Sequence, residues 1–173
     1  EPLPLPGPPI RELLGLTTLS GGEILALYDQ SAALFREGAW HPVEGVLPEL
    51  PYLAAAGPDG KVIIGDKTRP ALSVHQMREG SLQRTEVLDF AASQKNLVIY
   101  SVGLGADGRI WVGTGLGLGF VDGKETKRIR LLGSEDRIIH PECNQSALLV
   151  EAGRVWIGTP SGLMSYTPSP LPS

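Results

Sequence analysis

The stretch that decides the fold runs from Ala106 to Gly123 and reads ADGRIWVGTGLGLGFVDG. A turn-forming Asp-Gly leads into a short apolar run, a Gly-Thr stop, a glycine-rich bend and a second short apolar run. This pattern fits either a phosphate-binding glycine loop or one copy of a repeated β unit. A dinucleotide loop needs its glycines at the start of a helix. Gly119 is followed instead by FVDGKET, a strand-like run and another Asp-Gly turn. The stretch therefore favours the repeated β unit.

The same pattern occurs four times along the chain. Each copy has a glycine, a charged residue, a β-branched residue and a large apolar residue in succession. The large apolar residue is Trp111 in the third copy and Trp156 in the fourth. The aligned glycines are separated by 38, 48 and 45 residues and are Gly22, Gly60, Gly108 and Gly153.

Each copy contains further short alternating runs, such as KRIRLL in the third, and so predicts four short strands. The apolar spacing in 21–38 also fits a helix, but its place in the repeat favours strand, turn and strand. A period near 45 residues with four strands per copy indicates an all-β fold, a β-propeller of about four four-stranded antiparallel blades. The blades are expected within 11–168, at approximately 11–46, 51–90, 96–132 and 146–166.

Proline-rich segments flank the repeats and predict extended chain, a linker over 1–10 and a tail over 169–173. Three arrangements remain open for four blades: a small closed ring, half of an eight-bladed ring shared by two chains, or an arc of a larger propeller. The prolines at 2, 4, 6, 8 and 9 disfavour the first, because proline cannot donate to a β ladder.

Composition excludes several function classes. The net charge is −4, and the densest cationic patch is Lys127, Arg128 and Arg130, which predicts a solvated strand and no nucleic-acid partner. No stretch approaches 18 consecutive apolar residues, so no membrane insertion is expected in this segment. The single cysteine, Cys143, cannot form an intrachain disulfide or a zinc site built on paired thiolates.

The longest insertion outside the repeat, 133–146, is the candidate ligand-binding loop, because propeller rims carry binding residues in their loops. A plain connection between blades is the alternative. Cys143 is expected to be inert, and the three histidines, His41, His75 and His140, lack metal-ligand spacing. No catalytic motif, cofactor site or metal site is predicted. The candidate binding residues are Glu135, Asp136, Arg137, His140, Glu142 and Asn144.

Two copies, 107–122 and 153–166, resemble the two-component-regulator propeller repeat, with its Asp-x-Gly-x-Ile-Trp-Val-Gly-Thr core. The copy at 58–74 matches loosely, with Ile63 in place of tryptophan, and the copy at 19–35 is degenerate. The resemblance implies a periplasmic or extracytoplasmic sensor propeller of a bacterial signalling protein. Members of that family carry many more repeats than this chain.

The sequence therefore predicts a non-catalytic ligand-sensing or interaction domain in bacterial signal transduction, with an unknown ligand. Self-association, or contact with the remainder of a larger propeller, is expected, because unpaired blade faces expose apolar side chains. A propeller enzyme of the lyase or lactonase type, with a metal in the channel, is one alternative. A structural protein-binding scaffold is the other. A central Ca²⁺ or Mg²⁺ held by carboxylates of different blades would favour the enzyme.

Overall fold

The computed structural model describes residues 5–6, 12–94, 96–121, 128–136, 138, 142–151 and 153–169. Its regular elements are almost all β, as the sequence predicts, and two short 3-10 turns, η1 (Pro58–Gly60) and η2 (Ser134–Asp136), complete them. The chain divides into two compact units, Glu1–Leu88 and Asp89–Ser173, and each is described by itself. In the described part of the chain, no helix is both long and apolar enough to cross a lipid bilayer.

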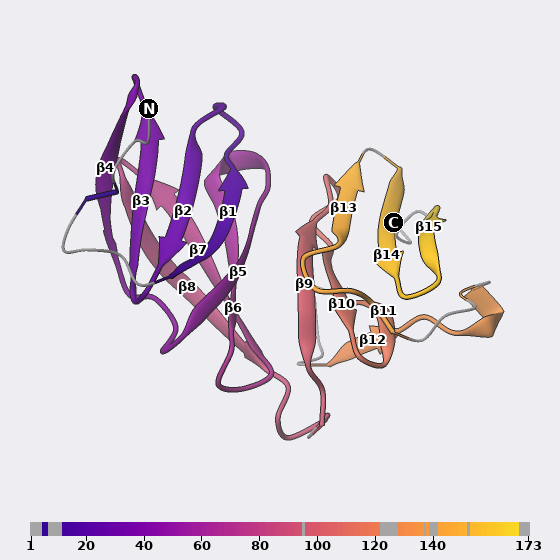
Figure 1. Cartoon of the computed structure of the whole chain (residues 1–173). Helices are drawn as coiled ribbons and strands as arrows, with labels where there is room; N and C mark the ends of the chain where they lie inside the picture. Colours follow the sequence, from indigo (N-terminus) through magenta and orange to yellow (C-terminus); the bar gives the residue numbers. More distant parts are fainter. Residues whose placement is uncertain are drawn as a thin grey trace. The chain divides into compact units, whose positions relative to one another are not determined.

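Unit 1 contains two four-stranded antiparallel blades (Figure 1). Blade 1 comprises β1 (Leu13–Thr18), β2 (Ile24–Tyr28), β3 (Ser31–Arg36) and β4 (Ala39–Gly45). Blade 2 comprises β5 (Pro51–Ala56), β6 (Lys61–Asp66), β7 (Ala71–Arg78) and β8 (Ser81–Asp89). The segment 21–38, which also fits a helix by apolar spacing, forms the β2–β3 hairpin, as its place in the repeat predicts.

Unit 2 contains the other two blades. Blade 3 comprises β9 (Ile99–Leu104), β10 (Ile110–Thr114), β11 (Gly117–Val121) and β12 (Ile129–Leu131). Blade 4 has three described strands, β13 (Leu148–Glu151), β14 (Arg154–Thr159) and β15 (Gly162–Tyr166). The glycine-rich stretch is the β10–β11 hairpin, in which Thr114 pairs with Gly117. The interpretation as a repeated β unit is therefore confirmed.

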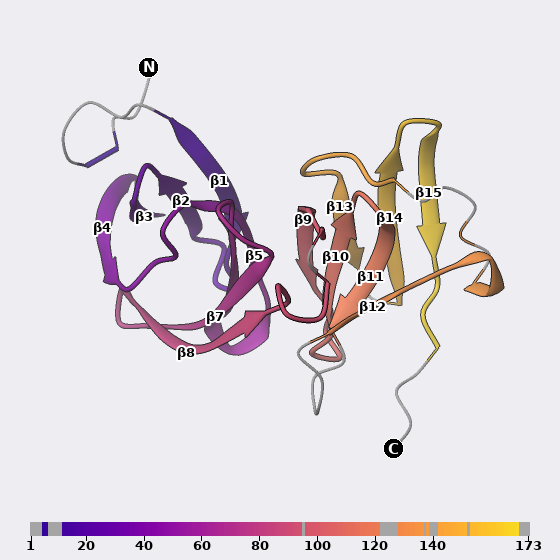
Figure 2. The same cartoon turned by 90° about the horizontal axis from the view of Figure 1, so that it is seen from below.

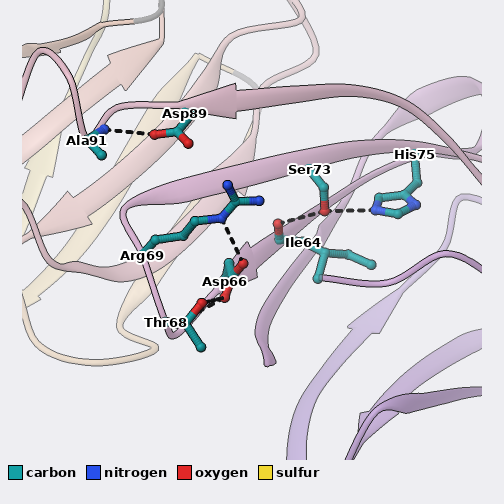
Figure 3. Close-up of polar contacts among 8 residues, drawn as sticks. All are labelled: Ile64, Asp66, Thr68, Arg69, Ser73, His75, Asp89 and Ala91. Carbon is teal, nitrogen blue, oxygen red and sulfur yellow. Dashed lines mark hydrogen bonds and ion pairs between the residues drawn. The ribbon is translucent and has the colours of Figure 1, made fainter. Parts of the chain in front are cut away.

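The turn after the second strand of a blade is closed by the same contact in three copies: a side-chain oxygen accepts a hydrogen bond from the N–H two residues later. The Thr114 hydroxyl donates to the Gly117 carbonyl at 2.7 Å and accepts from the Leu116 N–H at 3.1 Å. Thr159 makes the equivalent pair of bonds in blade 4. In blade 2 this position is Asp66, whose carboxylate accepts from the Thr68 N–H and hydroxyl at 3.0 and 2.7 Å (Figure 3). These side chains satisfy turn backbone groups and so have a structural role.

Every blade has two faces that can be named from its second strand. We call the face that carries Leu25, Ile63, Trp111 or Trp156 the tryptophan face of its blade, and the opposite face the counter face. In unit 1, the tryptophan face of blade 1, with Leu25 and Leu27, packs against Val62 and Ile64 on the counter face of blade 2. All four side chains are fully buried. At about 25 cal/mol per Å² of apolar surface, this burial is the main stabilising contribution at the blade interface.

Backbone pairing joins blades 1 and 2 at one edge. Glu44 and Gly45 of β4 pair in parallel with Ser81 and Leu82 of β8, which makes one eight-stranded sheet of the two blades. This join was not predicted from the sequence. Gly45 is required there: its φ is +153°, and a Cβ would lie 2.3 Å from the Leu82 carbonyl oxygen. Figure 2 shows the eight strands curling into a nearly closed arrangement.

Unit 2 repeats this interface with larger side chains. Trp111 and Phe120, on the tryptophan face of blade 3, pack against Val155 and Ile157 on the counter face of blade 4. The Trp111 ring lies edge-on to Tyr166, with 5.9 Å between centroids, and 5.2 Å from Phe120. Edge-to-face aromatic pairs at this spacing add to the free energy gained by burial. Trp111 is therefore the central side chain of the blade 3–blade 4 interface.

A buried polar pair lies on the counter face of blade 2 (Figure 3). His75 is opposite Val62 and is fully buried. Its Nε2 lies 2.8 Å from the Ser73 hydroxyl, which donates to the Ile64 carbonyl, while its Nδ1 is buried without a hydrogen-bond partner. Burial, and secondly the charge of Arg84, lower the pKa of His75 to about 4. His75 is thus a neutral core histidine.

Replacing Trp111 by alanine should lower the free energy of unfolding by about 3–5 kcal/mol, because the substitution leaves a large cavity between blades 3 and 4. Trp156 occupies the same repeat position but is only half-buried, so Trp156→Ala is the matched control and should cost less than about 2 kcal/mol. Urea unfolding followed by circular dichroism measures both. Equal losses would contradict the different environments of the two tryptophans.

Stability should fall as the pH is lowered from about 6.5 to about 4, because His75 takes up its proton more readily in the unfolded chain. The full contribution is on the order of 3 kcal/mol, is present above pH 6.5 and is lost below pH 4. The variant His75→Leu should lack this part of the pH dependence in urea unfolding. An unchanged slope in that variant would show that other groups cause it. Burial opposes the change, but hydrogen bonds from Thr68 and Arg69 and the charge of Arg69 lower the pKa of Asp66, so the stability that this carboxylate contributes is lost only below its ordinary pKa.

Candidate functional site

The predicted binding loop, 133–146, is held to both blades of unit 2 by its backbone. The Cys143 N–H donates to the Thr114 carbonyl at 3.1 Å, and the Asn144 N–H donates to the Gly158 carbonyl at 2.9 Å. The Ser146 N–H donates to the Tyr100 carbonyl at 2.8 Å. Gly113 allows this approach, since a Cβ there would lie 3.0 Å from the Cβ of Cys143. This end of the loop therefore joins blades 3 and 4.

The structure places the predicted site residues at separate points of this loop. Glu135 is exposed in η2, and Asp136 accepts a hydrogen bond from the Gly133 N–H at 3.0 Å. The side chains of Glu142 and Asn144 are exposed. Among the described residues of the loop, no hydrogen bond or ion pair joins any two of these four side chains. Arg137 and His140 lie outside the described residues.

Cys143 is part of the core of unit 2. It is 3% exposed and packs in the cluster that contains Trp111, Leu118 and Ile157. Burial, and to a smaller extent the negative charge of Glu142, raise the pKa of its thiol, while a backbone hydrogen bond at Thr114 opposes the increase. A buried thiol of raised pKa is a poor nucleophile. Of the three histidines, His75 lies in the core of unit 1.

The sequence did not indicate a site on the tryptophan face of blade 4. A hollow of about 540 Å³ lies on it. Leu149 is 55% exposed and Leu163 71% exposed, although the register places both on the same face as Trp156. The residues lining the hollow are Ser146, Ala147, Leu148, Leu149, Glu151, Trp156, Gly158 and Leu163.

Polar contacts fix the tryptophan at the centre of this open face. The Trp156 indole N–H donates to the Glu151 carboxylate at 3.0 Å, and the Arg154 guanidinium lies over the ring, 5.3 Å from its centroid. Glu151 and Arg154 are directly opposite each other in the β13–β14 register. The site is thus an apolar surface with a charged pair on one side, an arrangement typical of protein and small-molecule binding surfaces.

The equivalent face of blade 3 shows what such a face binds. Trp111 and Phe120 are covered by Val155 and Ile157 of the next blade, and Trp111 is only 1% exposed. Trp156 has the same position in the repeat, but its leucine neighbours are open to solvent. The two tryptophans therefore differ in their partners and not in their local sequence.

In the part of the chain that the structure describes, no group of three or more histidine, cysteine, aspartate or glutamate side chains is placed to hold a metal ion. Arg109, 7% exposed, contacts Asp107 at 3.2 Å and donates to the Ser169 carbonyl at 2.7 Å. Its guanidinium lies 5.4 Å from the centroid of Phe120, so it supports the blade 3–blade 4 interface.

No protein-family model and no curated protein sequence matches the chain. Solved propeller structures match its fold at low sequence identity. YCF48 from Cyanidioschyzon merolae is 11% identical with a TM-score of 0.64, over 90% of this chain and 50% of that protein. A structure of YCF48 with a D1 peptide also matches, at 14% identity and a TM-score of 0.57, over 88% of this chain and 49% of that one.

Two further neighbours come from bacteria. The gluconolactonase XC5397 from Xanthomonas campestris is 15% identical with a TM-score of 0.60, over 88% of this chain and 56% of that one. The extracellular domain of BT4673 from B. thetaiotaomicron, described as a hybrid two-component system, is 18% identical with a TM-score of 0.55. That match covers 90% of this chain and 22% of that one. The chain thus spans about half the length of YCF48 and of XC5397. The feature that it shares with them is the propeller fold.

Cys143 should react slowly with a thiol reagent in the folded chain, because its thiol is buried and its pKa is raised. Since it is the only cysteine, the absorbance change with Ellman's reagent reports on it alone. At pH 8 we expect the folded chain to react at least about tenfold more slowly than the chain in urea. Equal rates would show that the loop end at Cys143 is open to solvent.

Proposed function

We propose that this chain is a non-catalytic sensing and interaction domain of a bacterial signal-transduction protein, and that it works outside the cytoplasm. The tryptophan-containing repeats at 107–122 and 153–166 support this proposal through their resemblance to two-component-regulator propeller repeats. The fold shared with the extracellular domain of BT4673 also supports it. The division into a linker over 1–10, blades over 11–168 and a tail over 169–173 is part of the proposal.

The observation that carries the proposal is the open tryptophan face of blade 4. Its counterpart in blade 3 is fully covered by a neighbouring blade, whereas Leu149 and Leu163 here are mostly exposed. Contiguous apolar surface of this kind marks a binding surface in a soluble domain. We assign to it the binding of a protein partner, either a second copy of the chain or the remainder of a larger propeller.

The loop 133–146 adjoins this surface at Ser146, which lines the hollow. The Asn144 backbone is bonded to Gly158, another residue of the lining, so Asn144 lies at the edge of the surface. A ligand bound by the exposed side chains of Glu142 and Asn144 would therefore act directly on the edge of the partner surface. We propose that the loop, including Glu135, Asp136, Arg137 and His140, supplies the polar part of recognition.

The chain should self-associate through this face, with an average mass that rises with concentration. Leu163→Asp places a charge within the apolar surface and should weaken association at least about tenfold, because a charge buried without a partner is costly. Leu116→Asp is the matched control, since Leu116 is also exposed (55%) but lies in the β10–β11 turn. Sedimentation equilibrium measures both.

A chain that stays monomeric at millimolar concentration would contradict self-association through the open face. Equal weakening by Leu163→Asp and Leu116→Asp would show that association depends on net charge and not on the tryptophan face of blade 4.

A further inference from the structure

The counter face of blade 1, far along the sequence from the surface above, is occupied by a short segment of the same chain. Leu5 packs against a cluster of Ala26, Tyr28 and Ala33, together with Trp40. The Tyr28 phenol donates a hydrogen bond to the Pro6 carbonyl at 3.0 Å. One leucine and one proline carbonyl, 22 residues before Tyr28, thus cover one end of this blade.

Two alanines form the part of the blade 1 counter face that Leu5 contacts. Ala26 and Ala33 are opposite each other in the β2–β3 register and are fully buried. In blade 4 the corresponding pair is Ile157 and Met164, which fill the space against blade 3. The smaller alanine side chains extend less far from the sheet of blade 1, and the Leu5 side chain packs against them. The alanine pair therefore gives a leucine room to approach the sheet.

The polar contact suits a proline-containing ligand. Proline has no N–H, so a segment rich in proline cannot extend a sheet and offers only carbonyl acceptors. Tyr28 offers a donor, and its side chain is buried at the end of β2. Burial, and secondly the charge of Asp29, raise the pKa of Tyr28, so the phenol keeps its proton well above neutral pH. Half-buried Trp40, 5.1 Å from Phe35 between ring centroids, adds an aromatic wall.

A hollow of about 750 Å³ continues from this contact. It is bordered by Pro6 and Tyr28 and follows the β2–β3 turn toward Pro42, Val43 and Leu47. An extended ligand longer than the two residues in contact therefore has room beside Tyr28. Aromatic surfaces with a hydrogen-bond donor next to an apolar recess are the way that proteins bind polyproline II segments.

We propose that Ala26, Ala33, Tyr28 and Trp40 form a binding site for leucine–proline segments of polypeptide, and that Leu5–Pro6 occupies it in cis. Attachment to the same chain gives the occupant an effective concentration in the millimolar range. A free peptide therefore competes poorly with it, and the site is open to another leucine–proline segment when Leu5 is released. The proposal concerns unit 1 and does not depend on the function assigned to blade 4.

The test uses the full chain and a peptide of residues 1–7, EPLPLPG. The probe is the indole N–H resonance of Trp40 in ¹H–¹⁵N spectra, assigned with Trp40→Phe. The variant Leu5→Asp should release the cis segment and shift this resonance. Adding the peptide to that variant should restore the resonance toward its position in the unmodified chain in a saturable way. In the unmodified chain the same peptide should have at least about tenfold less effect at equal concentration.

Two controls separate recognition from general apolar contact. In the Leu5→Asp background, Tyr28→Phe removes only the phenol donor and should weaken peptide binding about three- to tenfold. The peptide EALALAG keeps the leucines, loses the prolines and should bind more weakly than EPLPLPG. Leu13→Asp changes an exposed leucine (50%) in β1 and should leave the Trp40 resonance unchanged.

The proposal is overturned if Leu5→Asp leaves the Trp40 resonance where it is, because the cis contact would then be absent. It is also overturned if the released site does not bind EPLPLPG at millimolar concentration, or if EALALAG binds equally well. None of these outcomes bears on Leu163→Asp and the association through blade 4, which is measured separately.

Discussion

The structure depends on one repeated contact, in which the tryptophan face of a blade is buried against β-branched side chains on the counter face of the next. Leu25 against Ile64 in unit 1 and Trp111 against Ile157 in unit 2 are two instances of it. No single blade can bury both faces by itself, because each is one sheet thick. The free energy of the fold therefore comes mainly from pairs of blades, and the short strands are stable only as parts of such pairs.

The same constraint explains why the two proposed binding surfaces lie on blades 1 and 4. The two described interfaces, one within each unit, bury one face of each of the four blades. A terminal blade keeps a face that must be covered by something else, and the two ends of this chain differ in how this is done. On blade 4, Trp156 is flanked by exposed leucines, which suits a protein partner. On blade 1, two alanines stand where blade 4 has larger side chains, and a leucine–proline segment packs against them. In both proposals the binding surface is a blade face that no other blade of the same unit covers.

Much of the fold could be predicted from sequence, because turn residues and apolar runs are local signals. The Asp-Gly turns and the runs KVIIG and RIWVG predict the strands that the structure contains. The open site could not be predicted in this way, since Trp111 and Trp156 have nearly identical neighbours in sequence and differ only in what covers them. The parallel pairing of Glu44 with Ser81 also has no local signal. Ligand binding by the loop 133–146 stays a prediction.

The central claim is most directly tested by the solvent exposure of equivalent tryptophans in one sample. A chain labelled with 5-fluorotryptophan has three ¹⁹F resonances, for Trp40, Trp111 and Trp156. The change in chemical shift between H₂O and D₂O, measured on dilute protein, reports contact of each ring with water. We expect almost no change for Trp111, which the next blade covers, and a clear change for Trp156, whose face is open. Equal changes for both would contradict it, because equivalent positions in the repeat would then have equivalent surroundings.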